Sequence, residues 1–230
     1  MRFLLTLAFS SLASFALAAE PVTIALAGDS TVTDKAGWGA GFAKLVGPKA
    51  TVLNFARGGA STKSFRDGGY WKKTLEAKPQ WVLIQFGHND QPGKGPERET
   101  DPKTTYRENL ARFIDEARAI GAKPVLVTSL VRRIYTPQGK FAGELEPYAE
   151  AARIVAAEKK VPVVDLNARS KALCEKLGAK ACDEFGPTHP KMKDKIDGTH
   201  LNEKGAAVFA AIVAEELKTT TPELAALLKP

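Results

Sequence analysis

A short segment near residue 30 carries a side chain that could act as a nucleophile. Gly28-Asp29-Ser30-Thr31 follows an apolar run, and a serine hydroxyl at a strand end can attack a carbonyl carbon if a base takes its proton. A serine here can equally cap a turn or a helix, so Ser30 alone does not establish catalysis. The G-x-S-x-G motif of lipases is not present, because Val32 stands in place of its second glycine.

The base that Ser30 would need can come from Asp197-Gly198-Thr199-His200, near the C-terminus. The spacing lets one turn present a carboxylate and an imidazole together. Asp197 would then fix the tautomer, and the other ring nitrogen could take a proton. The alternative is a capping aspartate beside a surface histidine. The chain has 3 histidines, so few other bases are available.

Two further segments could stabilise negative charge on a reacting carbonyl oxygen. In Asn54–Ser61, the pair Gly58-Gly59 would let backbone N–H groups approach an anion. In Gly87-His88-Asn89-Asp90, the Asn89 amide could donate to an oxyanion. An ordinary tight turn and an Asx turn are the respective alternatives.

Short apolar runs alternate with longer helical patterns along the chain, as in strands buried on both faces of a parallel sheet. The expected strands are Val22–Ala27, Thr51–Ala56, Trp81–Phe86, Pro124–Thr128 and Val161–Asp165. Helices are expected over approximately Lys103–Ile120, Tyr148–Lys160, Ala168–Leu177 and Asn202–Lys218. The pattern predicts an α/β protein, a three-layer α/β/α sandwich around a five-stranded parallel sheet. Loops after parallel strands gather at the carboxyl edge, where the reactive segments would meet.

The order of these segments resembles that of the SGNH (GDSL-type) hydrolases. In detail, the chain is similar to the rhamnogalacturonan acetylesterases of carbohydrate esterase family 12. The runs that carry this similarity are Leu26–Thr31, Gly58–Phe65, Phe86–Asp90 and Asp197–Asn202. The resemblance covers almost the whole chain beyond the N-terminus and implies the flavodoxin-like SGNH-hydrolase fold.

The resemblance also implies roles for particular residues. Ser30 would be the nucleophile, His200 the general base, and Asp197 the group that orients His200. The oxyanion hole would consist of the N–H groups of Ser30 and Gly59 and the side chain of Asn89. The arginine usual after the family's oxyanion glycine is missing here, where Ala60-Ser61 follows Gly59, so the sugar contacts of this loop are not implied.

Residues near these segments are candidates for substrate binding. Trp38 could stack on a sugar face or pack inside the protein, and His88 could contact substrate or be structural. Arg132 and Arg133 follow the fourth expected strand and could meet a uronate carboxylate, although solvated surface arginines are the simpler interpretation.

The N-terminus has the pattern of a secretory signal peptide over residues 1–18. Arg2 supplies the positive charge, an apolar stretch follows, and Ala16-Leu17-Ala18 is a small-x-small cleavage site. We therefore expect one SGNH-type esterase domain over residues 19–230, secreted to the periplasm or the extracellular space. An oxidising compartment favours a disulfide between Cys174 and Cys182, with two free thiols as the alternative.

The composition limits the partners. The net charge of +7 is dispersed, and no nucleic-acid-binding motif is present. No cysteine–histidine grouping has metal-ligand spacing, so we expect no metal and no organic cofactor. The resulting hypothesis is a monomeric serine esterase that deacetylates rhamnogalacturonan (pectin), without stable membrane association after signal cleavage. The alternatives are an acetylxylan esterase, a lysophospholipase or thioesterase, and, more distantly, a non-catalytic polysaccharide-binding protein.

Overall fold

A computed structural model describes residues 20–143 and 145–230 of the chain, so the expected signal peptide at 1–18 lies outside the described residues. The core is a five-stranded sheet in the order β2-β1-β3-β4-β5, and all of its strand pairs are parallel. The strands are β1 Val22–Gly28, β2 Ala50–Asn54, β3 Trp81–Gln85, β4 Lys123–Val127 and β5 Val163–Val164. The predicted fold class is confirmed.

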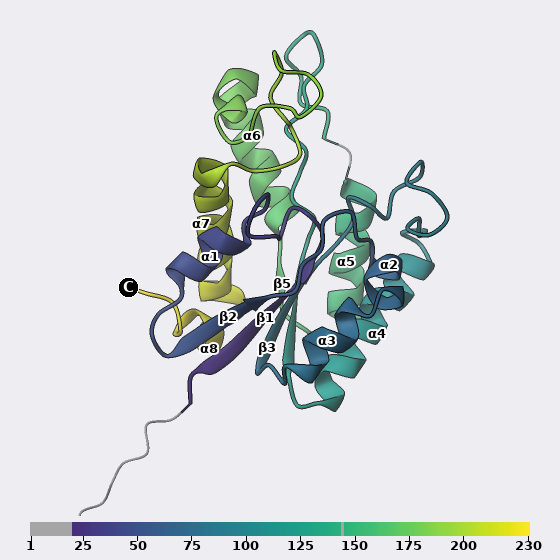
Figure 1. Cartoon of the computed structure of the whole chain (residues 1–230), viewed down its shortest axis with the longest axis vertical. Coiled ribbons are helices and arrows are strands. Elements are labelled where there is room, and N and C mark those ends of the chain that lie inside the picture. Colours follow the sequence, from purple (N-terminus) through teal and green to yellow (C-terminus); the bar gives the residue numbers. More distant parts are fainter. Residues whose placement is uncertain (1–19, 144) are drawn as a thin grey trace, which may run out of the picture.

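Helices cover both faces of the sheet, as Figure 1 shows. One face carries α1 Gly39–Leu45, α6 Leu166–Asp183, α7 Glu203–Thr220 and α8 Pro222–Ala225. The other face carries α2 Thr62–Asp67, α3 Tyr70–Glu76, α4 Thr105–Ala119 and α5 Glu146–Lys159. None of these helices is long and apolar enough to cross a membrane, within the part of the chain that the structure describes.

The alternation of side chains along β1 explains why both faces need a helical layer. Ile24 and Leu26 join the cluster formed with α1, α6, α7 and α8, whereas Ala25 and Ala27 join the cluster beneath α2–α5. All four are fully buried. Successive strand residues point to opposite faces, so a strand that is apolar at every position requires a cover on each side.

Element boundaries differ from expectation where polar or special residues intervene. β5 has only 2 residues, because the N–H of Val161 donates to Ala156 at the end of α5 and Asp165 caps α6. The helix expected over Ala168–Leu177 is part of the longer α6, in which Gly178 has φ 76° and makes a kink, after which helical structure resumes to Asp183.

The pairing register of β1, β2 and β3 places the loops that carry the candidate site residues at one edge of the sheet. Gly28 at the end of β1 is opposite Gln85 at the end of β3, and Leu26 is opposite Asn54 at the end of β2. The loops that carry Ser30, Gly59 and Asn89 therefore leave the sheet at nearly the same level. In Figure 1 the long loops gather beyond this upper edge of the sheet.

Candidate active site

The turn that carries Ser30 is held in place by the residues next to Ser30 in the sequence. The buried carboxylate of Asp29 accepts hydrogen bonds from the N–H and the hydroxyl of Thr31, both at 2.8 Å. A Cβ on Gly28 would lie 2.5 Å from Val32 Cγ2 and 2.7 Å from the Gln85 carbonyl oxygen. Only glycine lets the chain pass between these atoms, so glycine at position 28 is a geometric requirement of the turn.

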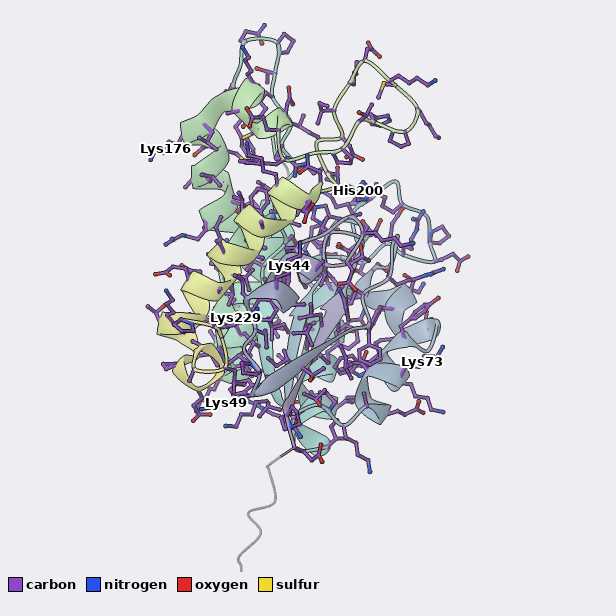
Figure 2. All side chains as sticks on the ribbon, turned by 60° about the vertical axis from the view of Figure 1, so that its left-hand side comes forward. Lys44, Lys49, Lys73, Lys176, His200 and Lys229 are labelled. Carbon is purple, nitrogen blue, oxygen red and sulfur yellow. The ribbon has the colours of Figure 1, made fainter. Side chains whose placement is uncertain are left out.

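The structure brings Ser30, Asp197 and His200 together although Ser30 and His200 are 170 positions apart. His200 Nε2 lies 3.0 Å from Ser30 Oγ, and His200 Nδ1 lies 2.8 Å from Asp197 Oδ2. Figure 2 shows His200 at the N-terminal end of α7. With Nδ1–H donating to Asp197, Nε2 carries the lone pair that can accept the Ser30 proton.

The Asp197 carboxylate is held in its charged form. Burial acts to raise its pKa, but hydrogen bonds from the His200 ring and from the N–H groups of His200 and Thr199 hold the pKa below its ordinary value. The two N–H groups lie 3.0 Å and 2.7 Å from Oδ1. One oxygen of Asp197 therefore shapes the turn while the other orients the imidazole.

Arg133 binds the backbone of this same turn, a role that the sequence did not predict, since it suggested only a uronate contact or a solvated surface arginine. Its guanidinium Nη2 donates to the carbonyl oxygens of Asp197 at 2.9 Å and His200 at 2.6 Å, and its own N–H donates to Gly198 at 2.7 Å. Arg133 is only 5% exposed, so the expectation of a solvated surface arginine is wrong for this residue. Its place in the segment that follows β4, at the carboxyl edge, was the available signal.

The donors of the expected oxyanion hole are not fully used by the hydrogen bonds of the described residues. Among the hydrogen bonds of the described residues, none uses the N–H of Ser30 or Gly59. Asn89 Nδ2 donates one hydrogen to the Ala60 carbonyl at 3.0 Å. The second hydrogen of this amide group can therefore be donated to another acceptor. Gly59 has φ 78°, a left-handed conformation that favours glycine.

The structure does not support substrate contacts by Trp38 and His88. Trp38 is 0% exposed, donates from Nε1 to Gln85 Oε1 at 2.8 Å and packs edge-on against Phe42. His88 is 2% exposed, with Nδ1 3.3 Å from Asp29 Oδ2. Both residues support the catalytic loops from inside, and neither offers a surface to a sugar.

The buried carboxyl of Asp90 is a site feature that the sequence did not reveal. Its Oδ1 accepts from the N–H and hydroxyl of Thr62 and from the hydroxyl of Thr100. Oδ2 has no hydrogen-bond partner among the described residues. Burial raises the pKa of Asp90 to about 7, against these hydrogen bonds. Asp90 thus ties the loop after β3 to the start of α2.

The two cysteines are free thiols in the structure, and the expected disulfide is not formed there. Both are buried, and the Tyr135 hydroxyl lies 2.8 Å from the Cys174 carbonyl oxygen and 3.1 Å from Cys182 Sγ. Burial raises the pKa of the Cys174 thiol to about 12. A protonated thiol in this environment is a poor nucleophile and metal ligand.

A serine, a histidine and an aspartate at the carboxyl edge of a parallel sheet define a serine hydrolase site. Residues 24–208 match the GDSL-like Lipase/Acylhydrolase family. The chain therefore belongs to this family of GDSL (SGNH) ester hydrolases, as its motifs predicted.

Individual proteins that are similar to this chain are consistent with the family assignment. The chain is 41% identical over 214 residues to the rhamnogalacturonan acetylesterase RhgT of Bacillus subtilis, covering 86% of this chain and 90% of that protein. It is 36% identical to a probable rhamnogalacturonan acetylesterase, YesY, of the same organism, covering 85% and 92%. The crystal structure of protein YXIM from Bacillus subtilis superposes with a TM-score of 0.73 at 26% identity, over 86% of this chain and 56% of that one.

We predict that Arg133→Met lowers kcat by roughly ten- to a hundredfold, because displacement of a catalytic group by about 1 Å has effects of that size. KM should change little, since the guanidinium holds His200 rather than substrate. Steady-state kinetics on p-nitrophenyl acetate, well below the melting temperature, measures this. Arg133→Lys should restore part of kcat, and Arg169→Met, which removes an exposed ion pair with Glu216, should behave as wild type. An unchanged kcat in Arg133→Met would contradict the positioning role.

We predict that Asp90→Asn weakens the pH dependence of stability. The ordinary carboxyl pKa of 3.8 becomes about 7 on folding, so the folded state binds this proton more tightly and stability falls as pH rises between these values. The full loss is at most about 4 kcal/mol. Asparagine stays neutral and keeps an acceptor for Thr62 and Thr100. Urea unfolding at about pH 5 and about pH 8 should show a smaller drop in the variant, whereas exposed Asp67→Asn should match wild type. An equal drop in Asp90→Asn would refute the assignment.

Proposed function

We propose that this protein is a secreted serine esterase that removes acetyl groups from a plant cell-wall polysaccharide, with acetylated rhamnogalacturonan as the substrate. The observation that carries the catalytic part is the 3.0 Å contact between His200 Nε2 and Ser30 Oγ, with Asp197 behind the imidazole. The 41% identity to a rhamnogalacturonan acetylesterase supports the substrate class. The N-terminal sequence pattern supports export.

The first half-reaction transfers the acetyl group to the enzyme. Ser30 Oγ attacks the acetyl carbonyl carbon while His200 Nε2 takes the hydroxyl proton, and the carbonyl π pair moves to oxygen. The N–H groups of Ser30 and Gly59 and the free N–H of Asn89 bind this oxyanion. When the intermediate collapses, the C–O bond to the sugar breaks and His200 returns the proton to the departing sugar oxygen.

The second half-reaction releases acetate. A water molecule attacks the acetyl-serine carbonyl while His200 again accepts a proton, and the same three donors bind the second oxyanion. Collapse of this intermediate returns the proton to Ser30 Oγ. Asp197 keeps the imidazole in the required tautomer and stabilises the imidazolium that forms in each half-reaction.

The test of this proposal is acetate release from acetylated rhamnogalacturonan, acetylated homogalacturonan and acetylated xylan. We expect the highest kcat/KM on rhamnogalacturonan and no release above background by folded Ser30→Ala. Higher activity on xylan would favour the acetylxylan esterase alternative. Faster turnover of p-nitrophenyl octanoate than of p-nitrophenyl acetate would favour the lysophospholipase or thioesterase alternative. Polysaccharide binding without acetate release by the intact protein would favour the non-catalytic alternative.

Asn89→Ala should lower kcat about a hundredfold, the usual effect of losing one oxyanion donor. The stabilisation arises in the transition state, so KM should stay within about threefold. Asn109→Ala is a matched control, because Asn109 on α4 donates to Thr62 Oγ1 at 3.1 Å and takes no part in the proposed chemistry. A loss confined to KM in Asn89→Ala would show that Asn89 binds substrate without stabilising the oxyanion.

A further inference from the structure

A group of cations lies in and beside the loop between β3 and α4. Lys94 and Arg98 belong to this loop, and Arg132 follows β4. All three are half-buried. Burial lowers the pKa of Lys94, and the charges of Arg132 and Arg98 lower it further.

The group is held in place by hydrogen bonds to the backbone of the same loop. Arg98 Nε donates to the Lys94 carbonyl oxygen at 2.8 Å, and Arg132 Nη2 donates to the His88 carbonyl oxygen at 3.1 Å. From the neighbouring α2, Lys63 donates to the Pro96 carbonyl at 2.7 Å. The Arg98 and Lys63 side chains are thus ordered by carbonyl groups, which orient a charge without neutralising it.

One carboxylate of this loop is engaged by the backbone of the loop itself. Glu99 accepts from the N–H of Gly95 at 2.6 Å. Within residues 20–143 and 145–230, neither Lys94 nor Arg98 forms an ion pair with a carboxylate. Positive charges gathered in partly desolvated surroundings favour binding of an anion.

The cations adjoin the two loops of the oxyanion hole. Arg98 Nη1 lies 3.9 Å from the position that a Cβ on Gly59 would occupy. Arg132 binds the carbonyl of His88, the residue directly before Asn89. An anion on this group would therefore lie beside the loops that carry Gly59 and Asn89.

We propose that Lys94, Arg98 and Arg132 form a subsite for the carboxylate of a uronate residue next to the acetylated sugar. This inference rests on the proposed function, since it names the charged part of the polymer that the site selects. The planar guanidinium group of Arg98 suits a carboxylate, to which it can donate two parallel hydrogen bonds. The subsite favours an acidic polymer such as rhamnogalacturonan over a neutral one such as xylan.

The test compares acetylated rhamnogalacturonan oligosaccharides with the same oligosaccharides after reduction of their uronate carboxyl groups to alcohols. Wild type should show a higher kcat/KM on the acidic form, and this preference should shrink as salt is added. In Arg98→Gln and Lys94→Gln the acidic-to-neutral ratio should fall about tenfold, the loss expected for one charge-assisted hydrogen bond. Lys72→Gln, on α3, should keep the wild-type ratio. An unchanged ratio in both loop variants would overturn the proposal.

A second measurement does not depend on the natural substrate. Unacetylated oligogalacturonate should inhibit hydrolysis of p-nitrophenyl acetate competitively, with an inhibition constant about tenfold higher in Arg98→Gln or Lys94→Gln. Equal inhibition of wild type and both variants would reject the subsite. If wild type hydrolyses p-nitrophenyl acetate but no acetylated polysaccharide, the proposed function fails, while this inhibition still decides whether the anion subsite exists.

Discussion

The contact between His200 and Ser30 is the constraint on which the active-site structure depends. It joins a turn after the first strand to a turn before the last long helix, and both must stay fixed for a proton to pass across 3.0 Å. Each partner is held by its own buried group. Asp29 shapes the serine turn through Thr31, and Arg133 holds the histidine turn through its carbonyl oxygens.

A buried chain of polar side chains connects the serine turn to the core. The Trp38 indole donates to Gln85, Gln85 donates to Thr31 at 2.7 Å, and Thr31 donates to Asp29. The second oxygen of Asp29 faces the imidazole of His88. Burial acts to raise the pKa of Asp29, but His88 and Thr31 hold it below its ordinary value. Because buried polar groups are costly when unpaired, this network favours one arrangement of the loop.

The sequence predicted the sheet from strong local signals, whereas each reactive segment is weak alone and its role was inferred from the resemblance that the four segments carry together. Strands buried on both faces appear as continuous apolar runs, and the stripe of α4 appears in the burial of Tyr106, Leu110, Phe113, Ile114 and Ala117. Ile120 at its end is 41% exposed, because the helix stops at Ala119. The helices α1, α2, α3 and α8 were not predicted, since 4 to 7 residues give too few turns to show a period.

Residues whose roles depend on tertiary partners could not be assigned from the sequence. Trp38 beside glycines resembles a sugar platform until Gln85 is seen to meet its indole. That glutamine, in an otherwise apolar strand, was the available hint. Arg133 resembles any arginine after a strand, because its acceptors lie 64 and 67 positions away. A hydrogen bond to a distant carbonyl oxygen leaves no pattern in the residue types.

The bonds from Arg133 to main-chain oxygens have a consequence for protein engineering. A peptide carbonyl is present whatever side chain its residue bears, so the arginine does not constrain residue identity where it binds backbone. The loop 187–196, which precedes Asp197 and contains several exposed residues, supplies none of the carbonyl oxygens that Arg133 binds. Libraries that vary its exposed side chains would therefore leave the arginine anchor of the histidine turn in place.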